Sequence, residues 1–228
     1  MKARGVEVVV ADDETAAAER VAELLAEAAR AGAEIALTGG STPGRAYERA
    51  AALEPDWSRA GLWWGDERCV PPDADESNYG LAKKTLLDRL ESPPARVHRI
   101  RGEDDPQRAA EAYERELRGV ALDLVLLGLG PDGHVASLFP RSPGLEERER
   151  LVIPAEPKLE PYIERVTLTP GPLRAGASVV FLVTGESKAD AVARALAGPP
   201  TDEVPGSLIR SAAGRTLAVV DRAAAAGL

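Results

Sequence analysis

Cysteine is nearly absent from this 228-residue chain, which contains only Cys69. A single thiol excludes an internal disulfide and a thiolate metal cluster, and it is typical of a reducing compartment. Long apolar runs are absent too. None is long enough to span a membrane, and the run near the start, in MKARGVEVVVADDE, is too short for a signal peptide. We therefore expect a cytoplasmic protein with no membrane partner.

Positive charge is also scarce. The 28 lysines and arginines stand against 37 aspartates and glutamates, so the formal net charge is -9, and no lysine-rich block or arginine stripe offsets it. Binding to nucleic acid depends on such a basic surface, so we expect no nucleic-acid partner. An anionic ligand has to be held by a local positive site.

Several catalytic motifs are missing as well. The chain has no GxSxG elbow and no HExxH, and Cys69 has no plausible histidine partner. A covalent acyl-enzyme is therefore disfavoured, and we expect no metal and no cofactor. The simple scheme that remains is a histidine that activates water, with cations that stabilise negative charge on the attacked group.

Strand-like and helix-like segments alternate along the chain, with no repeat and no low-complexity linker. This alternation is typical of a βα-wound sheet, and the length and 44% hydrophobic content fit one α/β domain over residues 1–228. Helices are predicted at Thr15–Arg30, after the glycine loop at 39–44, at Tyr79–Leu90, Pro106–Leu117 and Lys188–Leu196. Strands are predicted at Val6–Val10, Ile35–Leu37, Leu62–Trp64, Leu122–Leu127, Leu151–Ile153, Val166–Leu168, Val179–Val183 and Leu217–Val220.

One apolar strand ends abruptly in a glycine-rich turn, in LDLVLLGLGPDGHVASLFP. Three glycines between positions 128 and 133 let the chain turn, and they deliver Asp132 and His134 to the carboxyl end of the strand, where open α/β sheets bind ligands. Histidine titrates near neutral pH, so His134 is the first candidate for proton transfer, with Asp132 close enough to orient it. The alternative is a hydrogen-bonded structural histidine. The other histidine, His98, lies in VHRIR and is interpreted as structural or exposed.

A second glycine loop, Gly39–Arg45, nearly matches a nucleotide P-loop, but Arg45 and Ala46 replace its Lys and Ser/Thr. The loop lacks the hydroxyl that holds magnesium, yet it retains backbone amides, Ser41 and Thr42 at a helix N-terminus. It therefore suits a sugar phosphate better than ATP. The alternative is an ordinary strand-to-helix turn that Ser41 or Thr42 caps.

The glycines of the histidine turn also match the dinucleotide pattern GxGxxG, with Glu156 near the position of a ribose-binding acid. Pro131 and Asp132 would place a rigid ring and a negative charge beside a pyrophosphate. No clear amphipathic helix opens after Gly133. These features argue against a nicotinamide cofactor.

A long polar loop, GDERCVPPDADESNYG, follows the strand at Leu62–Trp64 and begins with Asp66, Glu67 and Arg68. Long ordered loops at strand ends usually have a function, although ion pairs of a solvated loop are the alternative. Sequence spacing alone leaves Arg165 and Lys188 as ordinary surface cations.

In combination, these motifs resemble the 6-phosphogluconolactonases over essentially the whole chain. The resemblance implies the fold of the glucosamine-6-phosphate deaminases and ribose-5-phosphate isomerases, in which helices flank a mostly parallel central sheet in three layers. It also implies hydrolysis of 6-phosphoglucono-1,5-lactone in the oxidative pentose phosphate pathway, with this small sugar-phosphate lactone as partner. We expect a monomer or a small homo-oligomer. The matching segments, in order, are LTGGSTPGRAYERAA, WWGDERCVPPDADESNYG, LVLLGLGPDGHVASLFP, RVTLTP and FLVTGESKADAV.

The resemblance assigns roles position by position. The catalytic candidates it implies are His134, Asp132 and Arg68, and those for substrate and phosphate binding are Gly39, Gly40, Ser41, Thr42, Arg45, Arg165 and Lys188.

Two rival functions remain. One is an aldose-ketose isomerase or deaminase with Asp66 or Glu67 as carbon base, although Phe139 stands where the deaminases carry a catalytic glutamate. The other is a sugar-phosphate sensor without enzymatic activity, which needs a basic helix-turn-helix segment that we do not find.

Overall fold

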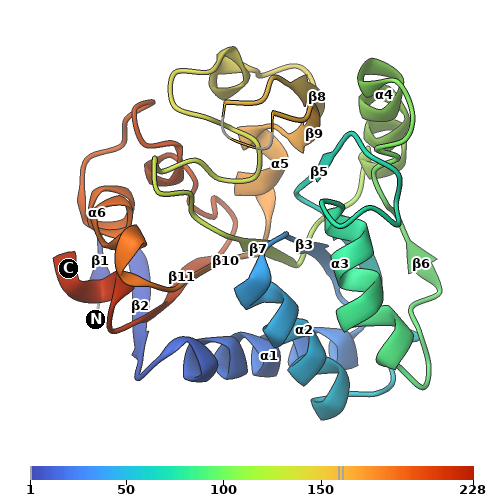
Figure 1. Cartoon of the computed structure of the whole chain (residues 1–228), viewed down its shortest axis with the longest axis horizontal. Helices are drawn as coiled ribbons and strands as arrows, with labels where there is room; N and C mark the ends of the chain where they lie inside the picture. Colours follow the sequence, from blue (N-terminus) through green and yellow to red (C-terminus); the bar gives the residue numbers. More distant parts are fainter. Residues whose placement is uncertain (1, 159, 161) are drawn as a thin grey trace.

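An eight-stranded sheet runs through the centre of the molecule (Figure 1). The structure is a computed structural model that describes residues 2–158, 160 and 162–228. Only β1 is antiparallel to its neighbour, whereas the other paired strands are parallel. In spatial order the strands are β1 (Lys2–Ala3), β2 (Val6–Ala11), β11 (Arg215–Asp221), β10 (Ser178–Val183), β7 (Leu124–Leu127), β3 (Glu34–Leu37), β4 (Gly61–Trp64) and β6 (Arg96–Val97).

The direction of winding reverses between β3 and β7. From β3 the chain proceeds outward to β4 and β6, then returns to β7 on the other side of β3 and proceeds outward to β10 and β11. The register pairs Ile35 with Leu124 and Ala36 with Val125, so β3 and β7 end close together. Open sheets leave a crevice at such a switch point. The predicted mostly parallel sheet is confirmed, and the two glycine loops follow the two strands at its switch point.

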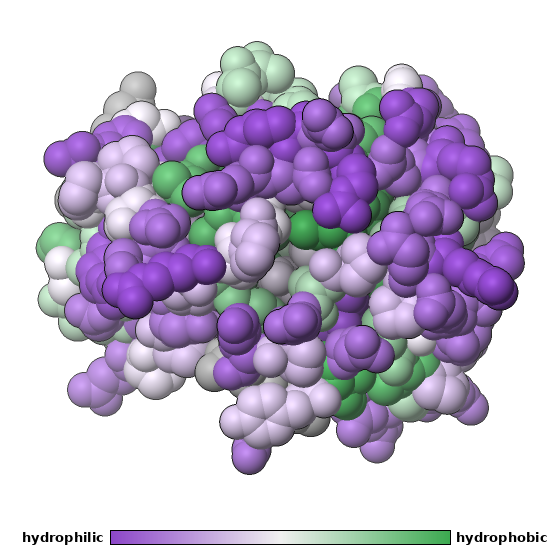
Figure 2. Space-filling model, turned by 90° about the horizontal axis from the view of Figure 1, so that it is seen from above, coloured by the Kyte–Doolittle hydropathy of each residue, from purple (hydrophilic) through white to green (hydrophobic). Residues whose placement is uncertain are grey.

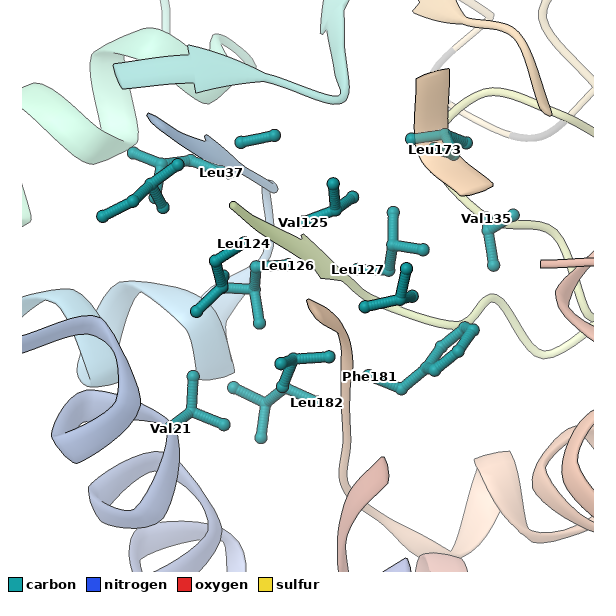
Figure 3. Close-up of a cluster of buried hydrophobic side chains, with 14 of the residues drawn as sticks. Val21, Leu37, Leu124, Val125, Leu126, Leu127, Val135, Leu173, Phe181 and Leu182 are labelled. Atoms are coloured by element: carbon teal, nitrogen blue, oxygen red, sulfur yellow. The ribbon is translucent and has the colours of Figure 1, made fainter. Parts of the chain in front are cut away.

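The core surrounds β7, whose four residues are all buried. In Figure 3, Val125 points towards the side of the helix that carries Leu173, whereas Leu124 and Leu126 point to the opposite side, where the helix that carries Val21 lies. A strand buried on both faces has a continuously apolar sequence, as the run around Leu126 does. Hydrophilic residues dominate the face in Figure 2, and hydrophobic ones show through only in separate patches. Within the described ranges, no helix has the length and apolar character needed to cross a membrane.

Helices cover both faces of the sheet. Figure 1 shows α1 (Glu14–Ala31) and α2 (Ser41–Leu53) below it, and α4 (Pro106–Leu117) and α5 (Pro170–Ala175) above it. Beside α2 lies α3 (Asn78–Thr85), and α6 (Ala189–Val192) continues into a π-helix at Ala193–Ala197. Short 3₁₀ turns occupy Leu87–Arg89, Pro143–Glu146, Glu186–Lys188, Pro205–Ser207 and Ala224–Gly227.

The helix ends follow local chemistry. Asp13 caps α1 by accepting a hydrogen bond from the amide of Ala16, and Gly32 ends the helix with a left-handed φ of 75°. Asp105 caps α4 in the same way, with Pro106 in the first turn. The predicted helices at both places are confirmed. Two others are shorter than predicted, because the stretches 79–90 and 188–196 mix α-helix with 3₁₀ or π turns.

A second, smaller sheet contains two of the predicted strands and corrects one prediction. It consists of β5 (Asp66–Arg68), β9 (Arg165–Leu168) and β8 (Val152–Ala155), all antiparallel. Two predicted strands therefore lie outside the central sheet, and the predicted loop start at Asp66–Arg68 is itself a strand. An apolar pattern predicts a strand but not its partner, which for β5 comes from about a hundred residues further along the chain.

Candidate active site

A cavity of about 470 Å³ opens at the carboxyl ends of the parallel strands, around the switch between β3 and β7. Residues that end or directly follow β3, β7, β10 and β11 line it, together with Arg68 of β5 and Arg165 of β9. Its polar and charged lining residues are Glu14, Thr38, Ser41, Thr42, Asp66, Arg68, Asn78, His134, Arg165, Thr184, Lys188 and Asp221. The cavity thus brings together both glycine loops and β5, here also called the DER strand (Asp66–Arg68).

His134 forms a short hydrogen bond with Asp132. The distance from Nδ1 to Oδ1 is 2.6 Å, and the same oxygen accepts the backbone amide of His134 at 3.1 Å. Burial alone would raise the pKa of Asp132, but the hydrogen bonds that it accepts from His134 outweigh burial and hold that pKa below its usual value. An ionised carboxylate only accepts hydrogen bonds, so Nδ1 carries the proton. Nε2 has no hydrogen bond within the described part of the chain, which leaves its lone pair for a ligand.

The histidine turn needs its glycines for space. A Cβ on Gly130 would lie 2.0 Å from His134 Nδ1, so any side chain there would displace the imidazole. Gly133 has a φ of 88°, which favours glycine. No helix follows, as predicted, and the nearest regular feature is a bridge between Val135 and Leu138. This turn offers no helix N-terminus that could bind a pyrophosphate, which argues further against dinucleotide binding.

Two of the cations face each other across a strand pair. Arg68 of β5 lies opposite Arg165 of β9, and like charges in directly opposed positions destabilise a sheet. Arg165 is only 6% exposed, and its guanidinium has no hydrogen bond or ion pair among the described residues. It lies over the ring of Phe139, 5.7 Å from the centroid. Burial, together with the charge of Arg68, lowers the pKa of Arg165. An anion bound here would offset both costs.

The loop before α2 presents backbone amides that have no hydrogen-bond acceptor among the described residues. The helix begins at Ser41 after Gly40, which has a φ of 114°, and no side chain caps it. Thr42 Oγ1 instead donates to Glu14 Oε1 at 2.8 Å and lies 2.9 Å from Thr184 Oγ1. The alternative in which Ser41 or Thr42 serves only as a cap is therefore wrong. The first amides of a 13-residue helix remain available to an anion in the cavity.

Lys188 and Arg45 behave differently from one another. Lys188 lines the cavity and is half-buried, with no ion pair in the described residues, and burial lowers its pKa. Arg45 points away. It pairs with Glu14 at 2.9 Å, its side chain is 55% exposed, and it does not line the cavity. Its predicted part in phosphate binding is not supported, because the α2 surface turns its side chain towards α1.

The acids of the DER strand have separate positions. Glu67 is 2% exposed, lies outside the cavity lining, and accepts the backbone amides of Asn78 and Tyr79 at the start of α3. Burial raises its pKa despite these donors. Asp66 does line the cavity, but it is held by Ser137 Oγ at 2.6 Å and by the Asn78 amide at 3.1 Å. Glu67 therefore anchors a helix and is not placed to remove a proton from a ligand.

Some lining residues were not predicted as site residues. Thr184 and Asp221 both stand at the ends of parallel strands, so the strand-end rule that found His134 would also have found them. Asn78 has a buried Oδ1 without a hydrogen-bond partner in the described part of the chain, and no local sequence pattern reveals it. No group of three or more metal-binding side chains occurs in the described ranges. Burial raises the pKa of Cys69 to about 11, which disfavours the thiolate form that a nucleophile requires.

Gly39 is packed against the side-chain amide of Asn78, and replacement of Gly39 by alanine is expected to disturb the site. A Cβ at position 39 would lie 1.9 Å from Asn78 Oδ1. Overpacking of this kind costs about 1–3 kcal/mol, so Gly39→Ala should lower the free energy of unfolding by that amount in urea titrations. Gly128→Ala is the matched control, because a Cβ there would meet nothing within 4 Å. Equal stability of the two variants would contradict the contact.

The sequence and the fold both match known proteins. Residues 11–218 match the family model described as glucosamine-6-phosphate isomerases/6-phosphogluconolactonase. The chain belongs to this family. A 6-phosphogluconolactonase of Streptomyces coelicolor is 41% identical over 236 aligned residues, which cover 94% of this chain and 90% of that protein. The human 6-phosphogluconolactonase is 40% identical, with 91% and 85% covered.

Solved structures of the family agree with this fold. The 6-phosphogluconolactonase of Trypanosoma cruzi superposes with a TM-score of 0.88 at 29% identity, covering 100% of this chain and 98% of that one. A monomeric glucosamine-6-phosphate deaminase reaches 0.85 at 20% identity, with 98% and 100% covered, which is a likeness of fold alone. The fold implied by the sequence resemblance is thus confirmed.

Proposed function

We propose that this member of the family hydrolyses 6-phospho-D-glucono-1,5-lactone to 6-phospho-D-gluconate in the oxidative pentose phosphate pathway. The observation that supports this most is the shared cavity. Among the described residues, it contains a histidine with an unpaired Nε2, free amides at the start of α2, and three cations without carboxylate partners. A phosphorylated ester needs these elements together. The relatives named 6-phosphogluconolactonase, at about 40% identity over most of the chain, support the same substrate.

The phosphate is proposed to bind at the amides of residues 39–42, with Arg165 and Lys188 closing around it. Such an anion relieves the uncompensated charge of Arg165 and uses the positive end of α2. The sugar then extends across the cavity towards His134. Fixing the remote phosphate in this way positions C1 for reaction.

The chemical step needs one water and one base. A δ-lactone is an activated ester, so no covalent intermediate is required. Nε2 of His134 takes a proton from water as the water oxygen bonds to C1, and Asp132 stabilises the resulting imidazolium. The bond from C1 to the ring oxygen then breaks, and the imidazolium returns the proton to that oxygen. Arg68 is the cation we assign to the oxyanion, because its half-buried guanidinium lines the cavity between the DER strand and α3.

The rival reaction on the same sugar phosphates uses a carboxylate to remove a proton from carbon. Glu67 lies outside the cavity lining, and both oxygens of Asp66 accept hydrogen bonds from neighbouring side chains. Phe139, at the position of the deaminases' glutamate, is 1% exposed and packs on the imidazole with ring centroids 4.9 Å apart. The residues thus favour hydrolysis over isomerisation or amine release.

The deciding experiment measures acid release from freshly prepared phosphorylated lactone at constant pH, with the spontaneous rate subtracted. The purified chain should accelerate the reaction in proportion to its concentration. Glucosamine 6-phosphate, tested in parallel for ammonia release, should give none. Ammonia release without lactone hydrolysis would replace the proposal by the deaminase reaction.

The affinity for the product is expected to fall at alkaline pH because of Lys188. A lysine is charged only below its pKa, and burial lowers that of Lys188 from the usual 10.5, with the carboxylate of Asp132 opposing the shift. As pH rises, the charge is therefore lost earlier than that of an exposed lysine, and the phosphate loses one partner. Calorimetric titration with 6-phosphogluconate should show this decline, and Lys188→Arg should move it to higher pH. A variant with the same pH dependence as the wild type would contradict the assignment.

A further inference from the structure

Arg210 lies outside the cavity and binds only backbone. Its guanidinium donates to the carbonyls of Gly206 at 2.8 Å, Ile209 at 2.7 Å and Ala195 at 2.6 Å. No carboxylate within the described residues pairs with it, and burial lowers its pKa. A half-buried guanidinium that donates hydrogen bonds to three carbonyls holds these carbonyls in one geometry.

Two of the three carbonyls belong to a compact loop of residues 201–209, here called the buttress loop. The loop is closed on itself, since Ser207 Oγ accepts the amide of Thr201 at 2.8 Å and donates to its carbonyl at 3.1 Å. A 3₁₀ turn at Pro205–Ser207 completes it. It is therefore a defined unit that Arg210 fixes from the carboxyl-terminal side.

The buttress loop packs directly on the histidine turn. The amide of Gly206 donates to the carbonyl of Gly133 at 2.9 Å, one residue before His134. The packing is close on both sides. A Cβ on Gly133 would lie 2.6 Å from Val204 Cγ1, and a Cβ on Gly206 would lie 2.6 Å from Leu129 Cδ1. A shift of this loop is therefore transmitted to the peptide that carries the imidazole.

The third carbonyl connects the same guanidinium to a second part of the cavity. Ala195 lies in the π-helix that continues α6. The last carbonyls of a helix lack intrahelical partners, so a cation is favourable at this end. The same helical segment begins directly after Lys188, which lines the cavity. One side chain thus ties the support of His134 to the helix that follows Lys188.

We propose that Arg210 is a positioning residue for the hydrolysis proposed above. It fixes the buttress loop against Gly133, and so keeps the imidazole of His134 aligned with Asp132 and with the bound lactone. It contacts neither the substrate nor the reacting atoms. Because misplacement by about 1 Å can cost a hundredfold in rate, loss of the guanidinium should lower kcat about tenfold to a hundredfold. KM should change less than kcat, because the α2 amides and Arg165, which bind the phosphate in this proposal, make no hydrogen bond with Arg210 or the buttress loop in the described residues.

The test compares Arg210→Lys and Arg210→Gln with Arg59→Lys. Lysine keeps the charge but cannot reach three carbonyls from one plane, so both Arg210 variants should lose kcat. Arg59 also donates to a backbone carbonyl, that of Arg30, at the opposite end of the sheet, so Arg59→Lys should keep wild-type kcat. Methylguanidinium added to Arg210→Ala should restore part of kcat by filling the vacated site. Wild-type kcat in folded Arg210→Lys and Arg210→Gln would overturn the proposal.

A spectroscopic measurement separates positioning from stability alone. The Nδ1 proton of His134, hydrogen-bonded to Asp132, should give a downfield proton resonance that His134→Gln removes. In Arg210→Lys this resonance should shift or broaden, whereas in Arg59→Lys it should not. An unchanged resonance together with reduced kcat would also refute the proposal. The resonance is measured without substrate. If the wild-type protein had no lactonase activity, the proposed function would be refuted, and the resonance alone would test the role of Arg210.

Discussion

Replacement of His134 by glutamine is expected to lower kcat on the phosphorylated lactone by a factor of about 10² or more, the usual contribution of a general base. KM should change little, because the phosphate cradle at residues 39–42 does not depend on the imidazole. Glutamine retains polarity and approximate size but offers no nitrogen that takes up a proton at neutral pH. Asp132→Asn should act in the same direction, because an amide no longer stabilises the imidazolium.

The chain supplies its own control for this experiment. His98 stacks on Trp63 at 3.9 Å between ring centroids, and its Nδ1 lies 2.7 Å from Glu116, near the edge strand β6 and outside the cavity lining. It is structural, as predicted. His98→Gln should keep wild-type kcat in a pH-stat assay after subtraction of the spontaneous rate. If His134→Gln also kept it, the water-activation step would have to be assigned to another group.

The site could be predicted from sequence where local chemistry determines it. Glycines at 130 and 133 are needed for the turn that carries His134, and the free start of α2 follows from Gly40 and the residues after it. Both loops follow parallel strands, so the rule for open sheets places them at one edge. The structure brings them into one cavity for this reason.

The site could not be predicted where distant segments meet. Arg165 resembled a surface cation because nothing near it in sequence indicates that β9 pairs with β5 and buries the side chain opposite Arg68. Arg45 followed the phosphate loop in sequence, yet helix geometry turns it towards Glu14. Asn78 reaches Gly39 across the cavity wall through a contact that no spacing rule contains. Burial and pairing of this kind arise only from tertiary packing.

The burial of Arg165 has opposite consequences for stability and for binding. Without a ligand, its guanidinium has no ion pair in the described residues and faces Arg68, so the folded state bears an uncompensated charge. Arg165→Met should therefore leave the thermal midpoint unchanged or raise it, since methionine fills a similar volume without a charge. Retention of such a residue at a cost in stability is typical of functional sites.

Binding should show the reverse effect, and it should depend on the phosphate. Removal of one partner of a buried, hydrogen-bonded charge pair costs about 2–5 kcal/mol, which is roughly thirtyfold to several thousandfold at 25 °C. Arg165→Met should lose that factor in kcat/KM on the phosphorylated lactone, but only a few-fold on unphosphorylated gluconolactone, which has no anion to bind. Arg174→Met, an exposed arginine on the following α5, is the control. Equal losses on both lactones would mean that Arg165 acts on the reacting carbonyl, and the cradle would then have to rely on the α2 amides and Lys188.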